Sequence, residues 1–145
     1  MKKILNIYCT VIISFVFLFA CKQSPVEGYN PPSLKFKTSA GYTYNDTTIN
    51  GGDPILIGII AERGEIEALK DADDLSNLIV KMSANGAADV IVYEHTMTAD
   101  EAALYEYEYS SFASAIAGDS VRFNVVVYNK DGYIAQKELT VLSNW

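Results

Sequence analysis

Three tyrosines at alternate positions are the side chains best placed to bind a ligand. The segment LYEYEYSSF contains Tyr105, Tyr107 and Tyr109, and in an extended strand these rings lie on one face. Aromatic faces can stack on sugar rings or anchor a protein partner. Alternate aromatic residues also commonly fill the core of a β-sandwich. We favour the core, and the tyrosine row (Tyr105, Tyr107 and Tyr109) remains the ligand-binding candidate.

Two glutamates alternate with these tyrosines and raise the question of acid–base chemistry. Glu106 and Glu108 lie on the opposite face of the same strand,. A close carboxylate pair serves glycoside hydrolases, in which the environment raises the pKa of one member. Neighbours on a solvent-facing strand lack the burial that separates two pKa values. We therefore expect no catalytic residue and no enzymatic activity.

An acidic cluster, DADD, contains Asp71, Asp73 and Asp74. Calcium prefers such hard oxygen ligands, but the cluster lacks the glycine and the distant glutamate of an EF-hand loop. A solvated loop is the favoured interpretation, and calcium binding is the alternative. No other motif points to a metal or a cofactor.

His95 is the single histidine of the chain. Catalysis by this histidine would need a partnered nucleophile or carboxylate. In a strand, His95 is in phase with Ile91, Tyr93 and Met97,. We therefore predict a partly buried structural histidine.

The first twenty residues have the layout of a secretory signal peptide. Two lysines precede a mostly apolar stretch that ends at the small residue Ala20,. A membrane-spanning helix, the alternative, needs about 20 apolar residues. This stretch is shorter and is interrupted by Asn6, Thr10 and Ser14. We expect residues 1–20 to be cleaved.

The segment Leu18-Phe19-Ala20-Cys21 resembles the lipobox of bacterial lipoproteins. The resemblance implies that the Cys21 sulfur receives a diacylglyceryl group and that the amine freed by cleavage is acylated, for example with palmitate. One acyl chain binds membranes marginally, at about 0.8 kcal/mol per buried methylene, whereas several chains hold a protein firmly. We therefore predict lipid attachment at Cys21 and a location in the cell envelope, at the outer membrane.

Composition indicates one acidic domain without disulfides. The chain has 145 residues and a net charge of −7. Residues 1–20 contain two lysines and no carboxylate, so their removal leaves −9. An acidic domain repels phosphate backbones, and we expect no nucleic-acid partner. Cys9 and Cys21 are the two cysteines, so the domain must rely on a packed core for its stability.

The remaining sequence alternates short strands with turns. Residues 21–33 are rich in proline and predict a flexible tether, and residues 34–145 predict one domain,. The segment Thr98–Ala103 suggests one helical turn with Glu101 completing a capping box. Turn signals lie at NGGD, Asn85-Gly86 and Asp131-Gly132,. This pattern predicts an all-β, antiparallel sandwich of about seven or eight strands. The expected strands are residues 34–38, 42–49, 54–61, 77–83, 90–97, 104–112, 121–129 and 133–142.

Two segments are similar to parts of immunoglobulin-like domains. AGDSVRFNVVVYNKDGYIAQKELTV is similar to the end of PKD-like and cadherin-like domains, and NDTTINGGDPILIGIIA is similar to an opening hairpin. The chain as a whole resembles small envelope lipoproteins that carry one such domain. The resemblance implies an immunoglobulin-like β-sandwich.

These observations predict a lipid-anchored, non-catalytic binding or adhesion module of the cell envelope. Its ligand is a glycan or a protein, and the alternative role is that of a structural accessory subunit in an envelope complex. Exposed aromatic residues at the loop end would favour a glycan. A flat apolar patch or a bare edge strand would favour a protein.

Overall fold

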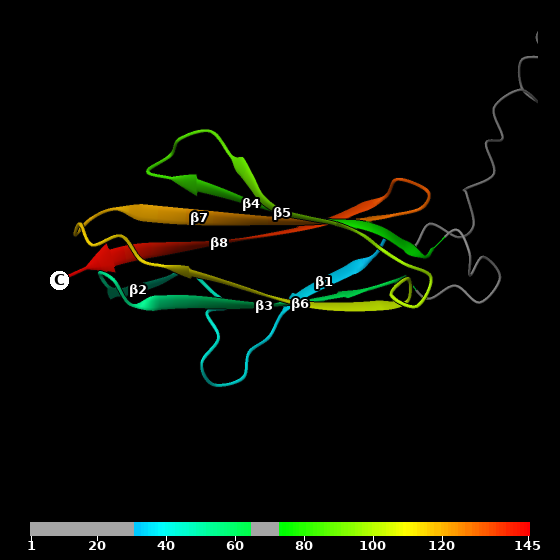
Figure 1. Cartoon of the computed structure of the whole chain (residues 1–145), viewed down its shortest axis with the longest axis horizontal. Coiled ribbons are helices and arrows are strands. Elements are labelled where there is room, and N and C mark those ends of the chain that lie inside the picture. The colour runs from blue at the N-terminus through cyan, green and yellow to red at the C-terminus, as the bar shows by residue number, and fades with distance from the viewer. Residues whose placement is uncertain (1–30, 65–72) are drawn as a thin grey trace, which may run out of the picture.

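The chain folds into two β-sheets that lie face to face. The computed structural model describes residues 31–64 and 73–145, and these residues form eight strands and no helix. Figure 1 shows β4, β7 and β8 in one layer and β3 and β6 in the other. The expected all-β, two-sheet architecture is confirmed. The strands are β1 (Ser33–Phe36), β2 (Thr47–Asn50), β3 (Pro54–Glu62), β4 (Leu75–Ala84), β5 (Val90–Thr96), β6 (Leu104–Phe112), β7 (Ser120–Asn129) and β8 (Ile134–Asn144).

One sheet has three strands and the other has five. Their orders are β1-β3-β6 and β2-β8-β7-β4-β5. All pairs are antiparallel except β2 and β8, which run parallel from Thr47 opposite Val141 to Asn50 opposite Asn144. The purely antiparallel arrangement expected from the sequence is therefore wrong at this pair.

A tight turn joins β2 to β3, yet the two strands belong to different sheets. The Gly51 N–H donates to the Asn144 carbonyl at 2.8 Å, which keeps the end of β2 beside β8. A Cβ on Gly51 would lie 2.8 Å from the Ser114 carbonyl oxygen, so only glycine fits this crossing. The turn predicted at NGGD is confirmed, but the opening hairpin that NDTTINGGDPILIGIIA resembles is wrong.

The hydrophobic core fills the space between the sheets. Strand β3 is central in its sheet, as the apolar run at residues 54–61 predicts, and β7 is central in the other sheet. Alternate residues of a strand face the same side, so each strand contributes every second side chain to the core. The largest fully buried apolar side chains of these two strands are Ile55, Ile57, Ile59, Phe123, Val125 and Val127.

The sandwich has a proximal end, where β1 begins, and a distal end, where β8 finishes. At the proximal end Ser33 pairs with Glu62, and the β7–β8 turn is attached there by the Lys130 N–H, which donates to the Asp74 carbonyl at 2.9 Å. At the distal end Gly118 donates to the Ser143 carbonyl at 2.9 Å. Figure 1 shows the C-terminus at the end opposite the beginning of β1.

Strands β4 and β5 form a hairpin with one irregularity. Asn85 and Gly86 have φ values of 50° and 75°, as the predicted tight turn requires. Farther along, Tyr93 lies opposite Val80 and Ile91 opposite Lys81. The unpaired residue between them is a β-bulge, which reverses the alternation of side chains. Ile91 is exposed, so the predicted common phase of Ile91, Tyr93 and His95 is wrong.

Several sequence-based predictions fall outside the described residues: the signal at residues 1–20, lipid attachment at Cys21, the tether up to residue 30, and Asp71. Within the described residues, β1 begins at Ser33, beside the domain boundary expected at residue 34. Among residues 31–64 and 73–145, no helix has the length and apolar character to span a membrane.

Candidate functional site

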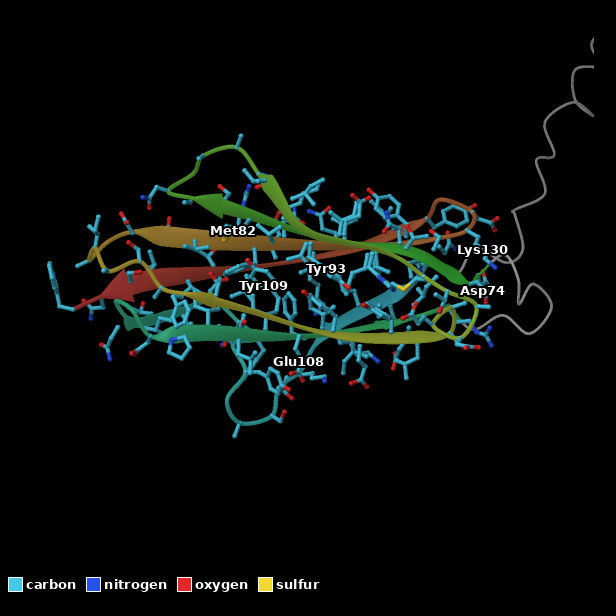
Figure 2. All side chains as sticks on the ribbon, in the orientation of Figure 1. Asp74, Met82, Tyr93, Glu108, Tyr109 and Lys130 are labelled. Atoms are coloured by element: carbon cyan, nitrogen blue, oxygen red, sulfur yellow. The ribbon has the colours of Figure 1, made fainter. Side chains whose placement is uncertain are left out.

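The tyrosine row faces the opposite sheet and not the solvent. The Tyr107 ring stacks on Tyr93 of β5 with 3.8 Å between centroids, and the Tyr105 ring stacks on His95 at 4.6 Å. The Tyr109 ring meets Phe123 edge-on at 5.8 Å. Because β5 and β6 are edge strands of different sheets, these rings close one open side of the sandwich. Figure 2 shows Tyr93 and Tyr109 between the layers.

The aromatic cluster, defined as Tyr93, His95, Tyr105 and Tyr107, also contains a hydrogen bond. The Tyr93 and Tyr105 hydroxyl groups lie 2.7 Å apart. Burial raises the pKa of Tyr105 far above its usual range, and the Tyr93 hydroxyl raises it further. Burial also raises the pKa of Tyr107. These neutral, stacked phenol rings join the two sheets. Their positions therefore favour the interpretation of the tyrosine row as core residues.

His95 is held by a carboxylate from the turn between β5 and β6. Its Nε2 lies 2.9 Å from Glu101 Oε2, and its side chain is 29% exposed. The same oxygen accepts hydrogen bonds from the Thr98 N–H at 2.8 Å and the Thr98 hydroxyl at 2.9 Å. The predicted partly buried histidine is confirmed. The carboxylate half of the capping box forms, but residues 99–102 make a turn and no helix.

Hydrogen bonds to Glu101 have a strong electrostatic consequence. The Thr98 backbone N–H is the main cause, followed by His95 and the Thr98 hydroxyl, and together they lower the pKa of Glu101 to about 2. Each of these groups favours the charged carboxylate. Glu101 therefore stays ionised across the neutral and mildly acidic range and fixes the His95 ring.

The two glutamates on the outer face of β6 share one lysine. Lys37 Nζ lies 2.9 Å from Glu106 Oε2 and 3.2 Å from Glu108 Oε1, while the Tyr42 hydroxyl also donates to Glu108. The Tyr42 and Lys37 hydrogen bonds lower the pKa of Glu108. A general acid needs the opposite shift, so this geometry does not favour the hydrolase chemistry considered from the sequence. Figure 2 shows Glu108 on the outer face.

A glycine makes room for this lysine. Strand β3 lies between β1 and β6, and the Lys37 stem crosses it at Gly58. A Cβ added to Gly58 would lie 2.6–2.7 Å from the Cβ, Cγ and Cδ atoms of Lys37. The Lys37 N–H donates to the Gly58 carbonyl at 2.8 Å. Gly58 therefore positions Lys37 over the sheet and toward the two glutamates.

The described part of the acidic cluster is paired or buried. Asp74 accepts hydrogen bonds from Arg63 at 3.1 Å and Lys130 at 2.8 Å, and the Lys130 interaction is the main cause of its lowered pKa. Asp73 is 3% exposed. A solvated loop therefore does not describe these two residues. Asp74, labelled beside Lys130 in Figure 2, links the β7–β8 turn to the chain before β4.

Large apolar side chains are exposed at the distal end. Phe112 at the end of β6 is 70% exposed, and Ile116 in the following loop is 64% exposed. Leu142 and the terminal Trp145 are exposed at the same end. The backbone brings these segments together, because Gly52 donates to the Ala113 carbonyl at 3.2 Å and Gly118 donates to Ser143. The sequence did not single out these residues, since single apolar residues are common on surfaces.

Comparisons with known proteins find a similar fold and no family. The chain is similar to superoxide reductase (neelaredoxin) from Ignicoccus hospitalis, with a TM-score of 0.50 and 11% identity over 77% of this chain and 82% of that one. Sporulation control protein Spo0M from Bacillus subtilis aligns with a TM-score of 0.39 and 6% identity, over 81% of this chain and 51% of that one. At these identities the likeness to superoxide reductase concerns the all-β fold alone.

Neither of the two sequence comparisons gives a match: no protein-family model matches the chain, and no curated protein matches it. Within residues 31–64 and 73–145, no group of three or more His, Cys, Asp or Glu side chains is placed to hold a metal ion.

Sequence reasoning missed the partners of the candidate residues. Tyr93 and Lys37 contact the tyrosine row and the glutamates, respectively, but neither was a candidate. The alternation in residues 34–38 does place Lys37 on the outer face. What the sequence does not contain is the strand order, which brings Lys37 across β3 to β6.

Proposed function

We propose that this protein is a lipid-anchored, immunoglobulin-like, non-catalytic binding or adhesion module of the cell envelope, and that its ligand is a protein. The strand order supports the immunoglobulin-like assignment. Immunoglobulin sandwiches join strands A, B and E in one sheet and C, F and G in the other. Strands β1, β3 and β6 take the first set of positions, and β4, β7 and β8 take the second.

Exposed apolar side chains at the distal end are the observation that supports a protein ligand. Phe112 is largely exposed there together with the aliphatic side chains of Ile116 and Leu142, and a mixed apolar patch of this kind, unlike aromatic rings alone, marks a protein-interaction site. The tyrosines that suggested a glycan platform stack on the other sheet instead. A lipid on Cys21 would precede β1, so the distal end would point away from the membrane and toward a partner.

The test is site-specific photocrosslinking in intact cells. A photoreactive phenylalanine analogue replaces Phe112 at the distal end or, as a matched control, Ile134, which is 47% exposed at the proximal end. We expect a discrete, protease-sensitive adduct from position 112 and none from position 134. A protease-resistant adduct that glycosidases remove would instead identify a glycan ligand. Equal adducts at both positions would contradict a distal binding surface.

A structural accessory role is the second candidate. The observation that favours it is the edge of β6, which carries no neighbouring strand among the described residues, because permanent partners often add a strand to such an edge. Stability of the complex without crosslinking separates the two roles. An accessory subunit would co-purify with its partner in fixed ratio after detergent extraction, whereas an adhesion module would be recovered mostly alone.

A further inference from the structure

The outer edge of β6 presents a row of backbone groups without a partner strand in the described part of the chain. On β3, the Gly58 and Leu56 carbonyls accept hydrogen bonds from Lys37 and Thr43 on the β1 side. Backbone groups alternate along a strand, so Ile57 and Ile59 point toward β6. They lie opposite Tyr109 and Tyr107.

It follows that the intervening residues of β6 point away from β3. Glu106, Glu108 and Ser110 direct their N–H and C=O groups to the free edge. Within residues 31–64 and 73–145, no strand pairs with that side.

Apart from its two glutamates, this edge lacks the features that usually protect an edge strand. Such strands are commonly short, bulged, or interrupted by charged side chains, especially lysine, or by proline. Strand β6 is nine residues long, contains neither lysine nor proline, and pairs with β3 without a register shift. The edge strand facing it, β5, does carry a bulge. Strand β6 is thus a regular template for an added strand.

Charge indicates the kind of strand that fits. Residues 82–121, which include β5 and β6, contain seven Asp or Glu and neither Lys nor Arg. On β6, Glu106 and Glu108 share the single cation Lys37. A second copy pairing antiparallel at Tyr107 would oppose glutamate to glutamate, which is unfavourable. A strand with basic side chains on this outer face would be favoured.

The inner face of β6 indicates which side chains would alternate with the basic ones on the added strand. Tyr105, Tyr107 and Tyr109 are half-buried, and an added strand would cover the edges of their rings. Side chains that alternate with the basic ones would lie on this inner face. They would be apolar because the neighbouring space is lined by aromatic rings and by the core.

We propose that the free edge of β6 binds an extended segment of a partner protein that alternates basic and apolar side chains. The segment would become the fourth strand of the three-stranded sheet, beside β6. Its basic residues would lie opposite Glu106 and Glu108, and its apolar residues would cover the tyrosine row. This inference stands apart from the distal binding surface, because it uses the backbone of Glu106 to Ser110 and not the side chains of Phe112 and Ile116.

The experiment measures binding of two synthetic peptides to the full chain in detergent. One peptide of about nine residues, the length of β6, alternates lysine and valine, and the other alternates glutamate and valine. We expect the lysine peptide to bind at least 10-fold more tightly. Amide NMR shifts should be largest at Glu106, Glu108 and Ser110. Equal affinity for both peptides, or shifts centred elsewhere, would overturn the proposal.

Two variants separate the edge from general charge. Ser110→Pro removes an N–H that faces the free edge and leaves the β3 side intact, which edge strands tolerate; binding should fall at least 10-fold. The pair Glu106→Gln and Glu108→Gln keeps the shape and should weaken lysine-peptide binding about 5-fold. Glu138→Gln, exposed on β8, is the matched control and should change nothing. Unaltered binding by Ser110→Pro, with a native circular dichroism spectrum, would contradict strand addition.

Discussion

A single carboxylate links the β5–β6 turn to the aromatic cluster and makes stability depend on pH. The pKa of Glu101 is lowered from 4.5 to about 2 by Thr98 and His95. A carboxylate with a lowered pKa stabilises the folded state fully above its unfolded pKa, and this contribution disappears as pH falls through the folded pKa. The relevant window therefore runs from about pH 5 down to about pH 2,.

Glu101→Gln tests this contribution. The amide oxygen still accepts a hydrogen bond from the Thr98 N–H but carries no charge. Urea unfolding should show the wild-type protein more stable than the variant at pH 6, with the difference shrinking steadily toward pH 2. Thr98→Ala, which removes only the hydroxyl donor, should give an intermediate pH dependence. A difference that stays constant from pH 6 to pH 2 would contradict the role of the Glu101 charge.

Single residues were predictable where their own strand determines their position. The alternation around Tyr107 assigned the tyrosines and glutamates to opposite faces, and the preference for core placement agrees with the stacking on Tyr93. The predicted phase of Ile91 was wrong because a β-bulge changes the alternation of side chains. No glycine or proline in the segment indicates this bulge. The ion pairs of Asp74 could not be predicted from the sequence, because its partners, Arg63 and Lys130, come from other parts of the chain.

Packing between elements makes Gly58 a sensitive position of β3. Glycine in a strand is usually unfavourable, so alanine would ordinarily stabilise by about 0.5–1 kcal/mol. Here the new methyl group would lie within 2.7 Å of three Lys37 side-chain atoms. Overpacking of this kind costs about 1–3 kcal/mol, which outweighs the gain in propensity. We expect Gly58→Ala to lower the free energy of unfolding and to separate Lys37 from Glu106.

Chemical denaturation of Gly58→Ala, compared with Lys37→Met, measures both effects. Methionine keeps an apolar stem but removes the charge, so it reports the ion pairs without the steric clash. Exposed ion pairs contribute little, and the methionine variant should therefore be much less destabilised than Gly58→Ala. A stabilised Gly58→Ala protein would contradict the close approach of the lysine stem.

Elements were predictable from periodicity and turn residues, but their partners were not. Each expected strand overlaps one of the eight strands found, and Asn85-Gly86 forms the predicted turn. Strand β2 pairs with β8, about 94 residues later, in parallel,. A tight turn normally predicts a hairpin, whereas here the chain changes sheets, with Gly51 so close to the Ser114 carbonyl that only glycine fits.

At the scale of the whole molecule, composition and spacing predicted the class of fold because eight short strands with one apolar face leave few alternatives to two packed sheets. Exposure could not be predicted in the same way. The distal side chains Phe112 and Ile116 resemble core residues in the sequence, and only the arrangement of the loops leaves them on the surface.

The anchor proposed at Cys21 makes the last prediction. Cys21→Ser removes the thiol that would carry the lipid. The domain begins its first strand at Ser33, so the substitution should leave the fold and the unfolding midpoint unchanged. We expect the variant to be absent from the membrane fraction and not to incorporate radiolabelled palmitate. Cys9→Ser, inside residues 1–20, is the matched control and should keep both properties. Continued labelling of Cys21→Ser would refute lipid attachment at this residue, because no other cysteine follows it in the chain.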